Sequence, residues 1–88
     1  MKIIVAEKYM IIADNVCSVE IYNEKNVCIF MSSQEEFIVE FLLKSNAEKC
    51  YEMLKEFFAV GNTGVSHLDR ATFDIEKQAG FLGIRIIY

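Results

Sequence analysis

The residues with the clearest potential for chemistry surround His67, the single histidine of the chain. Together with Ser66, Asp69 and a thiol such as Cys50, this histidine could supply a nucleophile, a base and an orienting acid. A simpler interpretation assigns Ser66 and Asp69 to helix capping and Cys50 to a buried helix stripe, where apolar surroundings make a thiol unreactive. The sequence contains no recognised catalytic spacing. We therefore expect a non-enzymatic protein, with a ligand-binding or enzymatic pocket near His67 as the alternative.

Metal and cofactor sites are weakly supported by the sequence. His67, Asp69 and Asp74 would offer one nitrogen and two carboxylates, without the paired histidines or clustered cysteines of familiar metal sites. The loop 61–64 has two glycines, but it lacks the Lys-Ser/Thr of a phosphate-binding loop and follows a helix C-terminus, where the dipole repels anions. The sequence predicts neither a metal nor a cofactor.

Composition narrows the class of protein. The chain has 88 residues, 53% of them hydrophobic, and carries 13 acidic against 9 basic side chains. This length suits a single domain spanning 1–88. The net charge of −4 disfavours general nucleic-acid binding, and no apolar run approaches the roughly 20 residues of a membrane-spanning helix. Three widely spaced cysteines without a Cys-x-x-Cys pair indicate packed, reduced thiols, so we expect a cytoplasmic location and no membrane association.

Alternating apolar residues predict three consecutive strands between residues 17 and 42. Their main apolar set lies at odd positions, and the residues at 3, 5, 9 and 11 share this parity. Odd positions must pair with odd positions across an antiparallel hairpin, so we expect both hairpin loops to contain three or five residues. Cys17 and Cys28 then lie on opposite faces and cannot form a disulfide.

One amphipathic helix is predicted over residues 45–60. Ser45 and Glu48 have the spacing of a capping box, and Gly61 suits a left-handed helix end. The apolar residues form one stripe at helical spacing, namely Ala47, Cys50, Tyr51, Leu54, Phe57 and Phe58.

The last third of the chain is ambiguous. Residues 66–79 fit a short second helix that begins at Ser66 and ends at Gly80, although Phe73 and Ile75 also alternate as in a strand. Residues 83–88 are predicted as a C-terminal strand that must pair in its own sheet or with a neighbouring chain. The expected fold class is α+β: an antiparallel meander of four to five strands with the helix packed on one face.

The even-numbered face of the predicted sheet carries more apolar surface than a monomer usually exposes. We therefore expect a small interaction module, a homo-oligomer or a subunit of a larger assembly, that uses this face or the C-terminal strand. The candidate interface residues are Tyr22, Phe30, Ile38, Leu42, Met53, Ile86 and Tyr88.

Overall fold

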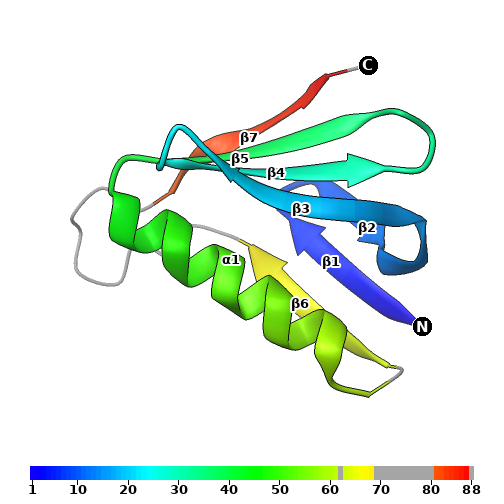
Figure 1. Cartoon of the computed structure of the whole chain (residues 1–88). Helices are drawn as coiled ribbons and strands as arrows, with labels where there is room; N and C mark the ends of the chain where they lie inside the picture. Colours follow the sequence, from blue (N-terminus) through cyan, green and yellow to red (C-terminus); the bar gives the residue numbers. More distant parts are fainter. Residues whose placement is uncertain (62, 69–80, 88) are drawn as a thin grey trace.

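The computed structural model describes residues 1–61, 63–68 and 81–87, and these form an α+β fold with two sheets and one long helix (Figure 1). Sheet A has the strand order β2-β1-β6 and sheet B the order β3-β4-β5-β7. The elements in chain order are β1 (Lys2–Ala6), β2 (Tyr9–Ile12), a 3-10 turn (Ala13–Asn15), β3 (Val16–Tyr22), β4 (Asn26–Met31), β5 (Glu36–Phe41), α1 (Lys44–Ala59), β6 (Gly64–Leu68) and β7 (Phe81–Ile87).

Sheet B is the predicted antiparallel meander, extended by β7. Ile21 pairs with Val27 and Ile29 with Phe37, so odd positions face odd positions. The β3–β4 connection between Tyr22 and Asn26 has three residues, and the β4–β5 connection between the paired Phe30 and Glu36 has five. Both loop lengths confirm the prediction.

A β-bulge changes the parity at the start of β3. Val16 pairs with Met31 and Ser18 with Phe30, which leaves Cys17 as the extra residue. The Cys17 side chain is exposed, so the prediction that all three thiols are packed is wrong for this residue. Cys28 and Cys50 are buried, and all three cysteines are free.

Sheet A departs from the predicted parity. The β1–β2 hairpin has the two-residue loop Glu7–Lys8, with Glu7 at φ 53°, and pairs Ile4 with Ile11. An even position therefore shares a face with an odd one. Ile4 and Ala6, rather than the residues at positions 3 and 5, are fully buried. The two-residue turn is the physical reason, because it shifts the pairing by one residue.

The segment predicted as a second helix begins as a strand. Residues 64–68 form β6, which runs parallel to β1, so a helix over 66–79 cannot start at Ser66. Ser66 and Leu68 are buried while Val65 and His67 are exposed, which is the two-residue period of a strand. The rest of that prediction lies outside the described residues. The predicted C-terminal strand is confirmed as β7, which pairs with β5, and Tyr88 lies outside the described residues.

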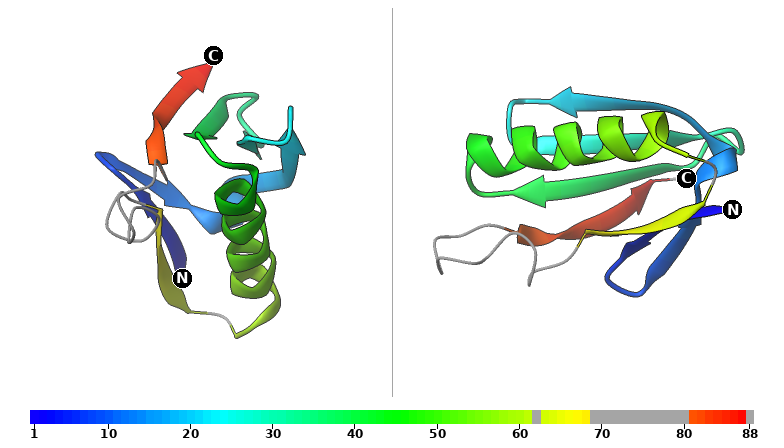
Figure 2. Two further views of the ribbon diagram at one scale, coloured as in Figure 1. Left: turned by 90° about the vertical axis from the view of Figure 1, so that its left-hand side faces the viewer. Right: turned by 90° about the horizontal axis from the view of Figure 1, so that it is seen from below.

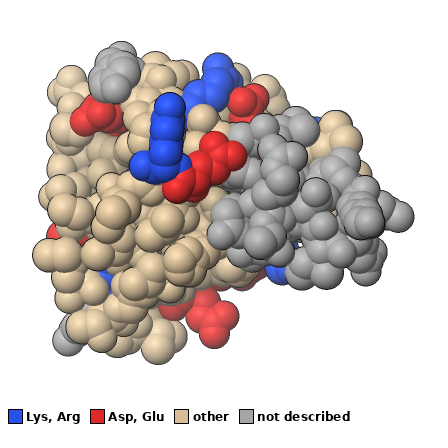
Figure 3. Space-filling model, turned by 180° about the vertical axis from the view of Figure 1, so that it is seen from behind, with Lys and Arg blue, Asp and Glu red and all other residues tan. Residues whose placement is uncertain are grey.

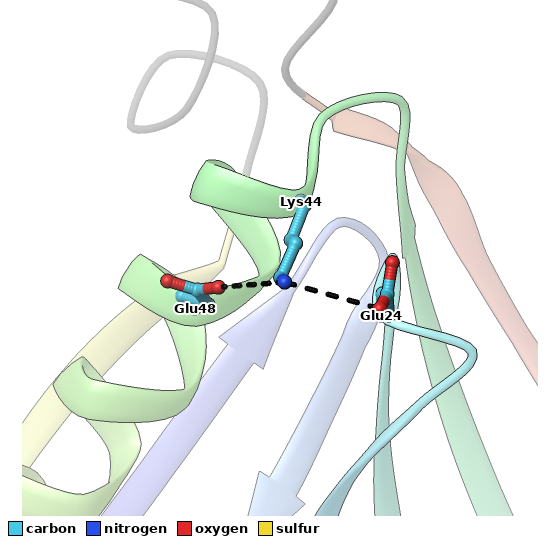
Figure 4. Close-up of polar contacts among 3 residues, drawn as sticks. All are labelled: Glu24, Lys44 and Glu48. Carbon is cyan, nitrogen blue, oxygen red and sulfur yellow. Dashed lines mark ion pairs between the residues drawn. The ribbon is translucent and has the colours of Figure 1, made fainter.

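The helix α1 begins one residue before its predicted start. Leu43 is its N-cap and no side chain caps the first turn, so the predicted Ser45–Glu48 capping box does not form. Lys44 instead lies within 3.8 Å of Glu24 and 3.9 Å of Glu48, joining the helix to the β3–β4 loop (Figure 4). Gly61 follows the helix with φ 68°, as predicted for a left-handed helix end.

The hydrophobic core lies between sheet B and a second layer made of α1 and sheet A. Figure 2 shows α1 and sheet A side by side against the same face of sheet B. Between these layers, the ring centroids of Tyr9 and Phe37 are 5.5 Å apart. The Lys2 amine donates a hydrogen bond to the Phe57 carbonyl, which connects sheet A to α1. The fully buried large side chains are Ile4, Ile11, Val27, Ile29, Val39, Phe41, Cys50, Leu54 and Leu68.

Candidate functional site

The face of sheet B that points away from α1 and sheet A is the candidate site, and we name it the outer face. Strand pairing arranges its residues in three rows of four, each row crossing β3, β4, β5 and β7 in that order. The central row is Glu20, Cys28, Ile38 and Arg85. The tyrosine row on one side is Tyr22, Asn26, Glu40 and Gly83. The phenylalanine row on the other side is Ser18, Phe30, Glu36 and Ile87.

A hollow of about 420 Å³ lies over the central row. Cys28 and Ile38 line it and are only 3% and 6% exposed, although none of the described helices or strands packs over them. Tyr22 and Phe30 line the same hollow. Tyr22 itself is 60% exposed. The outer face thus has a buried centre, and Tyr22 on its rim remains in contact with water.

Charged side chains lie at both ends of the central row. Arg85 Nε is 3.1 Å from Glu40 Oε1, and the Arg85 side chain remains more than half exposed. Glu20 is exposed on β3, at the opposite edge of the sheet, and among the described residues no cation lies within ion-pair distance of it. Seen from behind the view of Figure 1, basic and acidic side chains lie next to one another in the upper half of the molecule (Figure 3).

The Cys28 thiol is unsuited to nucleophilic chemistry. Burial is the main reason that its pKa rises from 9.0 to about 11, and a hydrogen bond with Glu36 and the negative charges of Glu36 and Glu20 raise it further. The positive charge of Arg85 opposes this increase only in part. Cys28 therefore remains protonated near neutral pH and serves as a small apolar side chain at the centre of the outer face.

The structure brings together only some of the predicted interface residues. Tyr22, Phe30 and Ile38 line the same hollow. Leu42 is exposed just beyond the end of β5. Met53 and Ile86 are half-buried and pack against the hydrophobic core, on the other side of sheet B, so they are not part of the outer face.

Arg85 and Ile87 are outer-face residues that the sequence did not predict. Both lie at odd positions of β7, which the register places opposite the even positions of β5. The predicted strand 83–88 contained these residues, but the loop length that sets its register could not be read from the sequence. The same register directs Ile84 and Ile86 toward the core.

The residues around His67 do not form the arrangement considered for catalysis. Ser66 is buried while His67 is exposed, so the two side chains lie on opposite faces of β6. Burial raises the pKa of the Cys50 thiol to about 12. Asp69 and Asp74 lie outside the described residues. Within the part of the chain that the structure describes, no group of three or more His, Cys, Asp or Glu side chains could hold a metal ion.

Comparison of the chain with known protein families, with characterised proteins and with solved structures finds no match. Over the described ranges, no helix combines the length and apolar character that crossing a membrane requires.

Proposed function

We propose that this protein is a non-enzymatic interaction module that self-associates through the outer face of sheet B. The observation that carries the proposal is the placement of both packing partners, α1 and sheet A, on one side of sheet B. On the other side Tyr22 and Ile87 remain 60% and 43% exposed around the buried Cys28 and Ile38. Exposed aromatic and aliphatic side chains around a buried centre are typical of protein–protein contact surfaces.

A second copy of the chain is the proposed occupant because the outer face carries charges of both signs at separate places. Glu20 lies at the β3 edge and Arg85 at the β7 edge of the same row. Glu20 and Arg85 of one copy can therefore pair with Arg85 and Glu20 of another. Three acidic side chains on the face, at positions 20, 36 and 40, argue against a nucleic-acid partner.

The size of the face predicts the strength of association. Four strands spaced about 4.8 Å apart and about 20 Å long give a footprint of roughly 400 Å² per copy, which is small for a permanent dimer. We therefore expect reversible association with a dissociation constant on the order of micromolar. All three cysteines are free and two of them are buried, which also supports the proposed cytoplasmic location.

Sedimentation velocity at protein concentrations from about 1 to 500 μM tests this proposal, because this range brackets the expected dissociation constant. We expect the weight-average sedimentation coefficient to rise with concentration. Tyr22→Glu should weaken association by about tenfold or more, because it places another acid on the apolar rim. Met10→Glu is the matched control, since Met10 is 71% exposed but lies on β2 in sheet A.

A wild-type protein that sediments as a monomer over the whole range would contradict self-association. Equal loss of association in the Met10 and Tyr22 variants would contradict the assignment of the outer face. The alternative function, a ligand or catalytic site near His67, stays a prediction.

A further inference from the structure

We infer that two copies stack their outer faces about a twofold axis that runs parallel to the strands of sheet B, so that Glu20 of each copy meets Arg85 of the other. This inference rests on the proposed self-association and specifies how the two copies are oriented relative to each other. It follows from the order of residues in the three rows, which the strand register fixes. Stacked sheets lie about 10 Å apart, a distance that facing glutamate and arginine side chains can span together.

The central row is complementary to itself under this rotation. An axis parallel to the strands reverses the strand order, so β3 of one copy lies over β7 of the other while each row stays at its own level. Glu20 then faces Arg85 of the second copy, and Cys28 faces its Ile38. Each dimer gains two pairs of opposite charge around a centre made of two thiols and two isoleucines. Arg85 can bind Glu20 of the second copy and keep Glu40, because a guanidinium has five N–H donors.

The tyrosine row is also complementary in shape. Tyr22, the most exposed aromatic side chain of the face, comes to lie over Gly83 of the second copy. Glycine carries no side chain that would meet the tyrosine ring. Asn26 in the same row faces Glu40 of the second copy, and an amide can donate a hydrogen bond to a carboxylate. The phenylalanine row places Phe30 over Glu36 and adds no charge pair.

The other in-plane twofold axis, perpendicular to the strands, is disfavoured by charge. It keeps β3 over β3 and β7 over β7, and it places Glu20 opposite Glu20 and Arg85 opposite Arg85. Like charges brought together at an interface oppose binding. The distribution of charge along the central row therefore selects the axis parallel to the strands.

Exchange of the two charges tests the inference. Glu20→Arg alone and Arg85→Glu alone each create two like-charge pairs per homodimer, so each variant should associate about tenfold or more weakly than wild type. In an equimolar mixture of the two variants, the heterodimer regains both opposite-charge pairs. We expect sedimentation of the mixture to show association close to that of wild type. Thermal melting of each variant shows whether it folds.

A second measurement keeps the test valid if Arg85→Glu, which also removes the pair with Glu40, does not fold. The conservative variant Arg85→Lys places an amine that a zero-length carbodiimide can join to a carboxylate. Within one chain, three strand spacings of about 4.8 Å separate positions 20 and 85, so a direct cross-link between them can form only between copies. Mixing ¹⁴N- and ¹⁵N-labelled protein identifies the product as intermolecular by mass spectrometry.

The outcomes separate this inference from the proposed function. Association of the mixed variants together with an intermolecular cross-link between positions 20 and 85 supports the inference. A wild-type dimer whose mixed variants do not associate, or whose cross-linked peptides join other positions, overturns the stacking geometry and leaves self-association intact. A monomeric wild-type protein overturns both. Association of the mixed variants without a cross-link between positions 20 and 85 would indicate the perpendicular axis, which also brings opposite charges together in the mixture, and would overturn the inference.

Discussion

Glu20 and Arg85 lie in register with each other at opposite edges of sheet B, in the row that also contains Cys28 and Ile38. The two charged residues are 65 positions apart in the chain, and only the pairing of four strands places them at one level. Their separation across the sheet prevents direct contact within one copy. This relationship makes the outer face complementary to itself, and the proposed stacking depends on it.

The three cysteines should differ widely in reactivity. Cys17 is exposed at the β3 bulge, whereas Cys28 and Cys50 are buried and have raised pKa values of about 11 and about 12. We expect a thiol reagent to modify Cys17 rapidly in the native protein and the other two only on unfolding. Peptide mass spectrometry after timed labelling measures this order. Rapid labelling of Cys50 in the folded protein would contradict the described core.

Stability should decrease at alkaline pH because of the buried thiols. Cys50 keeps its proton in the folded state up to a pKa of about 12, while the unfolded thiol ionises near 9.0. Above pH 9 the unfolded state therefore holds fewer protons, and the free energy of unfolding decreases by up to about 1.4 kcal/mol per pH unit for this group. Below pH 9 both states are protonated and Cys50 contributes no slope.

Urea unfolding of wild type and Cys50→Ala at pH 7 to about 10 measures this effect, because the variant lacks the linked proton. The alanine variant should be less stable at pH 7, since truncation leaves a cavity, and its stability should depend less on pH above 9. Cys17→Ser serves as the control and should retain the wild-type slope. Parallel curves for wild type and Cys50→Ala would contradict a protonated, buried thiol.

Gly61 should be important for ending α1. Its φ of 68° lies in the left-handed region, and an added Cβ would meet no heavy atom within 4 Å, so the cost of substitution comes from the backbone alone. We expect Gly61→Ala to lower the free energy of unfolding by about 1 kcal/mol. Gly61→Asn should cost less because asparagine tolerates this conformation better. Chemical denaturation compares the variants, and equal stability of Gly61→Ala and wild type would argue against the left-handed cap.

Sequence periodicity predicted the parts of the fold whose register is set by short hairpins. Parity required loops of three or five residues around β4, and the structure has one of each. The stripe along α1 also follows the prediction, with Ala47, Cys50 and Leu54 fully buried. These features depend on contacts between residues that are close in sequence, and the periodicity of one sequence is enough to predict such contacts.

The features that could not be predicted depend on contacts between distant segments. β6 pairs in parallel with β1, some 60 residues earlier, and Ser66 therefore lies in a strand rather than at a helix start. The register of β7 directs Ile86 toward the core and Arg85 toward the outer face. The sequence had instead placed Ile86, because it is apolar, in the predicted interface. At the candidate site the sequence predicted Tyr22, Phe30 and Ile38. The location of Arg85 on the same face follows only from strand pairing.

The most direct test of self-association through the outer face is a dilution series of ¹H–¹⁵N spectra, from about 10 μM to about 1 mM, a range that spans the expected dissociation constant. We predict that concentration-dependent shifts cluster at Tyr22, Cys28, Ile38 and Arg85, while residues of α1 that face solvent and those of β2 stay constant. Spectra that do not change with concentration, or shifts confined to sheet A and α1, would contradict the account.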